Sequence, residues 1–85
     1  MKRVQYTRSA TKTLTRMPAN TARLVQAKIE QYAADPRSLA NNAKTLTGKL
    51  AGITRLRVGD WRVFMDDDGT VLLILSINPR GGAYE

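Results

Sequence analysis

Three arginines stand close together in the middle of the chain, at Arg55, Arg57 and Arg62. Arg55 and Arg57 are two positions apart, so a β-strand directs both side chains to the same face. The pair Gly59-Asp60 is typical of a two-residue turn between antiparallel strands, and it returns Arg62 beside the other two. Guanidinium groups gathered in this way repel one another, and their planar forks match the oxygens of a phosphate. We therefore expect a phosphodiester backbone as the ligand of this hairpin.

The choice of proton-transfer groups is narrow, because the chain contains no His and no Cys. This excludes the usual general base, the commonest metal ligand and cysteine-based zinc sites. If the substrate is RNA, cleavage by the neighbouring 2′-OH leaves Tyr84 as the expected proton-transfer group or base-stacking platform. An unperturbed tyrosine has a pKa of about 10, so nearby arginines would have to lower it. Arg62 and Arg80 are the expected contacts to the transition-state phosphate, while Arg55 and Arg57 hold the backbone.

Each of these residues also has a plainer interpretation. The hairpin arginines could form a solvated strand face, and Arg80 could pair with Glu85 or the terminal carboxylate. Tyr84 could tie down the terminus by packing. The carboxylates Asp66-Asp67-Asp68 flank an Asp-Gly turn and diverge along a strand, so we expect no metal site there.

Composition indicates one small basic domain. The 85 residues carry 14 Lys and Arg against 7 Asp and Glu, a net charge of +7, and residues 1–28 contain no acid at all. Such a balance favours nucleic acid, an anionic membrane surface or an acidic protein as partner. No signal-peptide apolar region follows Met1, and the longest apolar run, Val71 to Leu75, is too short to cross a bilayer. We expect a cytoplasmic protein with no membrane partner.

Hydrophobic periodicity predicts the element order β-α-α-β-β-β. Ser9 is a plausible cap of the first helix, Pro18 ends it, and Asp35-Pro36 stops the second. The last strand is apolar on both faces, so it should be central and covered on both sides. The order predicts an α+β domain in which two antiparallel helices pack on one mainly antiparallel sheet. The expected elements are a strand at 3–6, helices at 10–17 and 20–34, a loop over 37–52, and strands at 53–58, 61–66 and 70–77.

This pattern resembles the RelE/ParE superfamily of bacterial type II toxins, small basic proteins that are usually encoded beside a neutralising antitoxin. The resemblance spans essentially the whole chain, as a single domain over residues 1–85. It departs from many relatives at Pro79, where they carry His or Lys. The residues that carry it are Leu46-Thr47-Gly48, the stretch 55–63, Asp67-Asp68-Gly69-Thr70, and Ser76 to Arg80 followed by Tyr84.

The resemblance implies an activity and a set of site residues. The RelE-like branch cleaves messenger RNA in the ribosomal A site without metal, whereas the ParE-like branch poisons DNA gyrase. Arg55, Arg62, Arg80 and Tyr84 match catalytic positions of the nuclease branch. This implies a ribosome-dependent, metal-independent mRNA endonuclease that inhibits translation and needs no cofactor.

The implied partners are messenger RNA, the ribosome and a cognate antitoxin, through which the complex would bind operator DNA. Lys44, Lys49 and Arg57 are the expected RNA-binding residues. Two alternatives stay open: a ParE-like gyrase inhibitor, and a non-catalytic basic domain that only binds its antitoxin.

Overall fold

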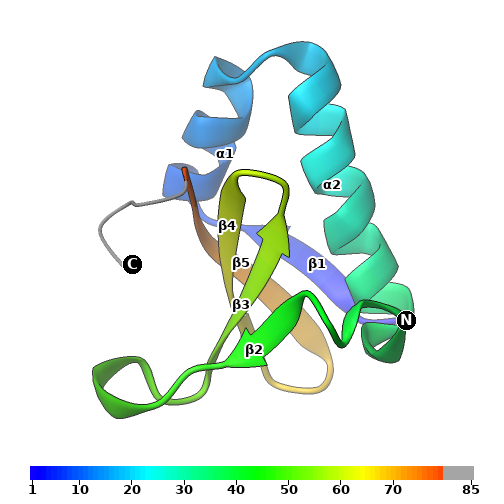
Figure 1. Cartoon of the computed structure of the whole chain (residues 1–85), viewed down its shortest axis with the longest axis vertical. Coiled ribbons are helices and arrows are strands. Elements are labelled where there is room, and N and C mark those ends of the chain that lie inside the picture. Colours follow the sequence, from blue (N-terminus) through cyan, green and yellow to red (C-terminus); the bar gives the residue numbers. More distant parts are fainter. Residues whose placement is uncertain (80–85) are drawn as a thin grey trace.

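The computed structural model of the chain describes residues 1–79. Two helices form an antiparallel hairpin beside a five-stranded sheet (Figure 1). No helix in this part of the chain is long and apolar enough to cross a membrane. The elements in order are β1 (Arg3–Tyr6), α1 (Arg8–Arg16), α2 (Ala19–Ala34), the 3₁₀ turn η1 (Pro36–Leu39), β2 (Ala43–Thr45), the 3₁₀ turn η2 (Gly48–Leu50), β3 (Ile53–Val58), β4 (Trp61–Asp67) and β5 (Val71–Pro79).

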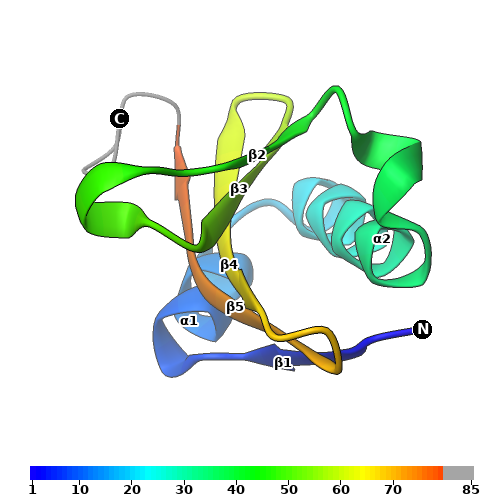
Figure 2. The ribbon, with the colours of Figure 1, turned by 90° about the horizontal axis from the view of Figure 1, so that it is seen from below.

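The sheet has the strand order β1-β5-β4-β3-β2. β1 runs parallel to β5, while the other three neighbouring pairs are antiparallel. Figure 2 shows β1 and β2 at opposite edges of the twisted sheet. The predicted α+β class, with two helices on one mainly antiparallel sheet, is therefore confirmed.

One hydrophobic core lies between the helices and one face of the sheet. α2 contributes Val25, Ile29 and Tyr32, which recur at helical spacing and are buried. The sheet meets them with alternate residues of each strand, such as Leu56 of β3 and Val63 of β4. Within residues 1–79 no helix packs on the opposite face, which we call the open face. The functional side chains must therefore be sought there.

β5 is an inner strand, but the prediction that both its faces are covered is wrong for the described part of the chain. Leu72, Ile74 and Ile77 are buried against the helices, whereas Leu73 and Leu75 stay half-exposed. The pairing register shifts between Phe64 and Met65, so that β5 carries one extra residue, Leu75. This bulge brings Ile74 and Ile77, three positions apart, onto the same face.

Two local predictions are corrected by tertiary contacts. α1 begins at Arg8 and is capped by Thr7, not Ser9, because the Thr7 hydroxyl accepts from the Ala10 N–H at 3.1 Å and donates to the Leu75 carbonyl at 2.7 Å. The segment 37–52 is more than a loop. It contains β2, whose three residues pair with β3 at the edge of the sheet.

Two of the three consecutive aspartates, Asp67 and Asp68, support the turn between β4 and β5. Asp68 accepts the backbone N–H groups of Thr70 and Val71 at 2.8 and 2.7 Å, and these hydrogen bonds lower the pKa of its carboxyl. Asp67 accepts the Gly69 N–H and forms a 2.7 Å ion pair with Lys2. No group of three or more metal-ligating side chains gathers within residues 1–79.

Candidate functional site

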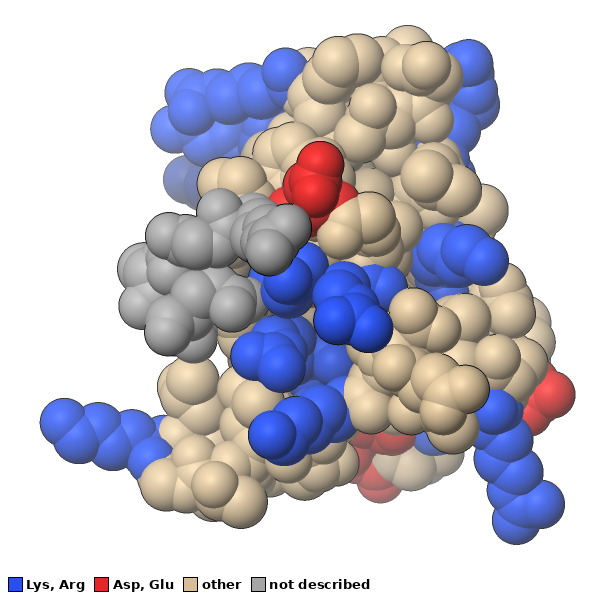
Figure 3. Space-filling view, viewed as in Figure 1, with Lys and Arg blue, Asp and Glu red and all other residues tan. Residues whose placement is uncertain are grey.

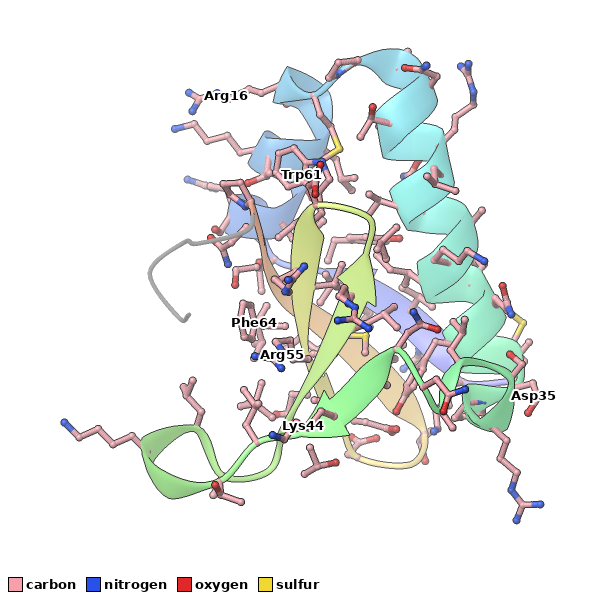
Figure 4. All side chains as sticks on the ribbon, in the orientation of Figure 1. Arg16, Asp35, Lys44, Arg55, Trp61 and Phe64 are labelled. Atoms are coloured by element: carbon pink, nitrogen blue, oxygen red, sulfur yellow. The ribbon has the colours of Figure 1, made fainter. Side chains whose placement is uncertain are left out.

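The open face carries a row of side chains that crosses four strands. Lys44 of β2 lies opposite Arg55 of β3, which lies opposite Phe64 of β4, which lies opposite Ser76 of β5. Directly paired residues of neighbouring strands project to the same face. Figure 4 shows Arg55 beside Phe64, with Lys44 following on β2. The row places two basic side chains next to a buried aromatic ring.

A second row of the open face is more strongly charged. Arg57 of β3 lies directly opposite Arg62 of β4, and Arg62 lies opposite Asn78 of β5. Arg55 is two positions before Arg57 and therefore adjoins both on the same face. The register confirms the prediction that Arg55 and Arg57 share a face, and it adds Arg62 to that face.

These basic residues surround a pocket of about 200 Å³ on the open face. Lys and Arg side chains gather over this part of the sheet in Figure 3. Lys44 and Arg57 form no ion pair with any acidic residue among residues 1–79. The pocket is lined by Asn41, Asn42, Ala43, Lys44, Arg55, Arg57 and Arg62.

Asn41 and Asn42 are pocket residues that the sequence did not reveal. The backbone explains their position, because the Arg57 N–H donates to the Asn42 carbonyl at 2.8 Å and draws this segment against β3. Their amide groups add neutral donors and acceptors to a pocket that is otherwise cationic. Two asparagines inside a long polar segment are an ordinary loop composition, so no sequence signal distinguished them.

Arg62 is held over the turn that precedes it. Its Nη1 donates long hydrogen bonds to the carbonyls of Gly59 and Trp61, at 3.5 and 3.4 Å. Gly59 has a φ of +57°, a backbone conformation that glycine adopts without strain. The turn thus fixes both the return of β4 and the direction of the guanidinium. Trp61 itself is half-buried and packs against the core.

Phe64 gives the open face an apolar floor. It is 3% exposed although it lies on the opposite face from the helices, directly across from Arg55. Strand alternation contains the signal that would have found it, because Phe64 is two positions from Arg62. A buried ring beside guanidinium groups lowers the local exposure to water, which strengthens their interaction with an anion.

Of the remaining predicted site residues, only Lys49 lies in the described part of the chain. Lys49 lies on η2, in a segment beyond β2, and does not line the pocket. Arg80 and Tyr84 lie outside the residues that the structure describes, so their roles stay predictions.

Neither tyrosine of the described part is placed to transfer a proton in the pocket. Tyr32 is buried in the core. Tyr6 lies by the groove between α1 and α2, where burial and, secondarily, the charge of Glu30 raise the pKa of its phenol. A raised pKa keeps Tyr6 protonated at neutral pH, so it is a poor base.

Comparison with known proteins identifies the family. The model of the ParE toxin of type II toxin–antitoxin systems (parDE) matches residues 4–84. The chain belongs to this family. No curated protein sequence matches the toxin.

Solved structures agree with the family in fold. The RelE–RelB complex of Pyrococcus horikoshii OT3 has 26% sequence identity and a TM-score of 0.76, covering 96% of this toxin and 98% of that chain. The RelBE2 complex of Mycobacterium tuberculosis also has 26% identity, with a TM-score of 0.66 over 93% and 98% of the two chains. The YoeB/ParE toxin of Agrobacterium tumefaciens, at 19% identity over 94% and 99% and a TM-score of 0.75, shares the fold. The toxin is thus a type II toxin of the RelE/ParE superfamily.

Proposed function

We propose that this toxin is a metal-independent endoribonuclease that cleaves messenger RNA on the ribosome and so inhibits translation. The observation that carries the proposal is the convergence of Lys44, Arg55, Arg57 and Arg62 around one pocket of the open face. Three guanidinium groups and an ammonium form a site for a phosphodiester. The likeness to two RelE–RelB complexes at 26% identity supports the nuclease branch of the superfamily.

The proposed reaction is attack of the 2′-OH of one nucleotide on the adjacent phosphorus, with departure of the 5′-oxygen of the next. It yields a 2′,3′-cyclic phosphate and a free 5′-hydroxyl. Charge builds up on the phosphorane oxygens, where Arg62 donates hydrogen bonds that strengthen in the transition state. Arg55 and Arg57 hold the scissile phosphate and its neighbour, and Lys44 contributes a point charge at the edge of the pocket.

Proton transfer falls to Tyr84 in this proposal. The 2′-OH must lose a proton and the 5′-oxygen must gain one, and arginine does neither near neutral pH. Tyr84 would act within a cationic environment, which lowers the pKa of a phenol. Arg80 would share the phosphorane charge with Arg62. A chain with no His and no Cys has few groups that can transfer protons, which fits an enzyme that relies on the ribosome to orient its RNA.

The proposed neutralising partner is a cognate antitoxin. The two relatives at 26% identity are each described as a toxin–antitoxin complex, which supports an equivalent complex here. An antitoxin segment that folds on binding would cover basic surface of the toxin. The complex would then contact operator DNA through the antitoxin.

One observation favours a second candidate, inhibition of DNA gyrase, because the matching family model describes ParE of the parDE system. The two functions place different demands on Arg62. A nuclease needs its guanidinium for the chemical step, whereas a gyrase inhibitor does not use an RNA-cleaving pocket.

Primer extension on a defined mRNA, with translating ribosomes and with naked RNA, separates the two candidates. Gyrase supercoiling is assayed with the same protein preparations, and EDTA is added in excess to the naked RNA. Cuts that need ribosomes and vanish in Arg62→Ala establish the nuclease. Inhibited supercoiling with uncut mRNA, from protein that arrests growth, establishes the gyrase inhibitor instead.

A further inference from the structure

The outer face of α1 carries a second basic surface, apart from the arginine pocket. Arg8, Lys12 and Arg16 recur every four residues and are all exposed; we call them the α1 ridge. Figure 4 shows Arg16 directed away from α2, and Figure 3 shows basic side chains along this corner of the molecule. None of the three lines the pocket that contains Arg55, Arg57 and Arg62.

Repulsion within the ridge is not offset by any acid in the free helix. Like charges four residues apart repel each other, and no residue of the ridge forms an ion pair within residues 1–79. Arg8 opposes the helix dipole at the first turn, which contains no acid, whereas Arg16 in the last turn is favourably placed, so the dipole leaves the repulsion uncompensated. No acid near the ridge in the sequence can offset these charges, because residues 1–28 contain none. The repulsion between these side chains is explained if the ridge binds an anionic ligand.

The chemistry of the ridge fits a nucleic-acid backbone better than a protein. Its exposed neighbours include Thr11 and Thr15, of which Thr15 donates its hydroxyl to the Lys12 carbonyl at 2.8 Å, while Ala10 of α1 and the following Met17 are buried. Protein interfaces depend on apolar and aromatic anchors, and beside the ridge such residues, among them Pro18 and Trp61, adjoin Arg16 at one end only. Phosphates need only cations and hydroxyl donors.

The length of the ridge matches a run of phosphates. Eight residues of α-helix separate Arg8 from Arg16, a rise of about 12 Å. One strand of B-form DNA carries a phosphate about every 3.4 Å along its axis, and the shorter rise of an A-form RNA duplex spaces them slightly more closely, so the ridge spans about four of them. A rigid helix presents its cations at fixed intervals, as a duplex presents its phosphates.

We propose that the α1 ridge docks the sugar–phosphate backbone of an RNA duplex, as ribosomal RNA presents, and anchors the toxin while the pocket acts on mRNA. The inference rests on the proposed function for its biological setting, but duplex binding can be measured alone. Contacts of this kind are independent of base sequence and sensitive to salt.

The test compares two triple variants of equal charge. Arg8→Gln/Lys12→Gln/Arg16→Gln removes the ridge, and the control Arg3→Gln/Arg23→Gln/Arg37→Gln removes three exposed cations elsewhere. Each protein is titrated onto a labelled RNA duplex by fluorescence anisotropy, from about 50 to 200 mM salt. We expect the ridge variant to bind roughly tenfold more weakly at low salt, with the log–log salt slope reduced by about two to three. The control should keep most of the affinity and the slope.

Ribosome experiments separate this inference from the proposed nuclease. The ridge variant should cosediment poorly with ribosomes but regain mRNA cleavage at high toxin concentration, whereas Arg62→Ala should cosediment normally and cleave at no concentration. If wild type binds duplex RNA through the ridge yet cuts no mRNA, the nuclease proposal fails and the ridge assignment stands.

Three results would overturn the ridge assignment. One is an equal loss of duplex binding in both triple variants, which indicates a net-charge effect. Another is an unchanged salt slope in the ridge variant. The last is a ridge variant that binds RNA normally but escapes neutralisation by the antitoxin, which would make α1 a protein-docking surface. Circular dichroism should show that the ridge variant is folded, because replacing the three cations relieves their mutual repulsion.

Discussion

Arg57 and Arg62 lie directly opposite each other in the β3–β4 ladder, with both side chains on the open face. Like charges at opposed positions of a sheet destabilise it, so this pair opposes the stability of the hairpin. The ladder nevertheless holds the two residues side by side, and the Arg62 guanidinium also donates to the carbonyls of Gly59 and Trp61. A phosphate that enters between them meets two donor groups that the backbone already brings together, which reduces the ordering cost of binding.

Arg57→Gln should therefore leave the hairpin at least as stable while weakening RNA binding. We expect the free energy of unfolding to stay level or rise by up to about 0.5 kcal/mol, because one member of a repulsive pair is neutralised. Urea denaturation measures the stability, and anisotropy with single-stranded RNA measures the affinity. Arg23→Gln, on the exposed side of α2, is the matched control. A stability loss above about 1 kcal/mol would show that Arg57 supports the fold instead.

The ion pair between Lys2 and Asp67 should couple the start of β1 to the end of β4. The Nζ–Oδ2 distance is 2.7 Å, the two side chains are 21% and 19% exposed, and Lys2 Nζ lies 5.7 Å from the centre of the Tyr32 ring. A double-mutant cycle with Lys2→Met and Asp67→Asn should give a coupling energy of about 1 kcal/mol. Both substitutions retain the shape of the side chain, so packing changes little. A coupling near zero would mean that solvent screens the pair.

Asp68 should make stability depend on pH in the acid range. Backbone hydrogen bonds from Val71 and Thr70 lower the pKa of its carboxyl, so its contribution is present above the ordinary value of about 3.9 and is lost as pH falls through the lowered one. Wild type should unfold at higher urea than Asp68→Asn at pH 7, and the two midpoints should converge as pH falls below about 4. A constant difference across this range would contradict the assignment.

Gly59→Ala should destabilise the hairpin through its backbone alone. The φ of +57° is costly for a residue with a Cβ, yet no heavy atom lies within 4 Å of the site that the Cβ would occupy. We expect a loss of about 1–2 kcal/mol in the free energy of unfolding. Gly59→Asn should lose less, since asparagine tolerates this region. Equal losses for both variants would indicate a steric cause.

The hairpin was predictable because its information is local. Alternation over 53–58 and the Gly59-Asp60 turn determine the strands, their register and the shared face of Arg55 and Arg57. Phe64, which the sequence analysis did not single out, lies on the face of Arg62 by the same alternation. Helix α2 was equally predictable from the sequence, since its buried residues recur at helical spacing.

The missed features depend on contacts between distant parts of the chain. β2 has three residues and no apolar alternation, so only its ladder with β3 makes it a strand. Thr7 becomes the helix cap because its hydroxyl also meets the Leu75 carbonyl, a contact across the fold. Asn41 and Asn42 enter the pocket because the Arg57 N–H donates to the Asn42 carbonyl and brings this segment against β3. Such partners cannot be assigned from one segment at a time.

The most direct test of the proposed nuclease is single-turnover cleavage of mRNA bound to the ribosome, comparing wild type, Arg62→Ala and Arg23→Ala. We predict a cut that leaves a 2′,3′-cyclic phosphate on the upstream fragment, and a rate at least about 10²-fold lower in Arg62→Ala. Arg23→Ala should cleave at the wild-type rate. Uncut mRNA with wild type, or an Arg62→Ala rate equal to wild type, would contradict the assignment of the arginine pocket as the catalytic site.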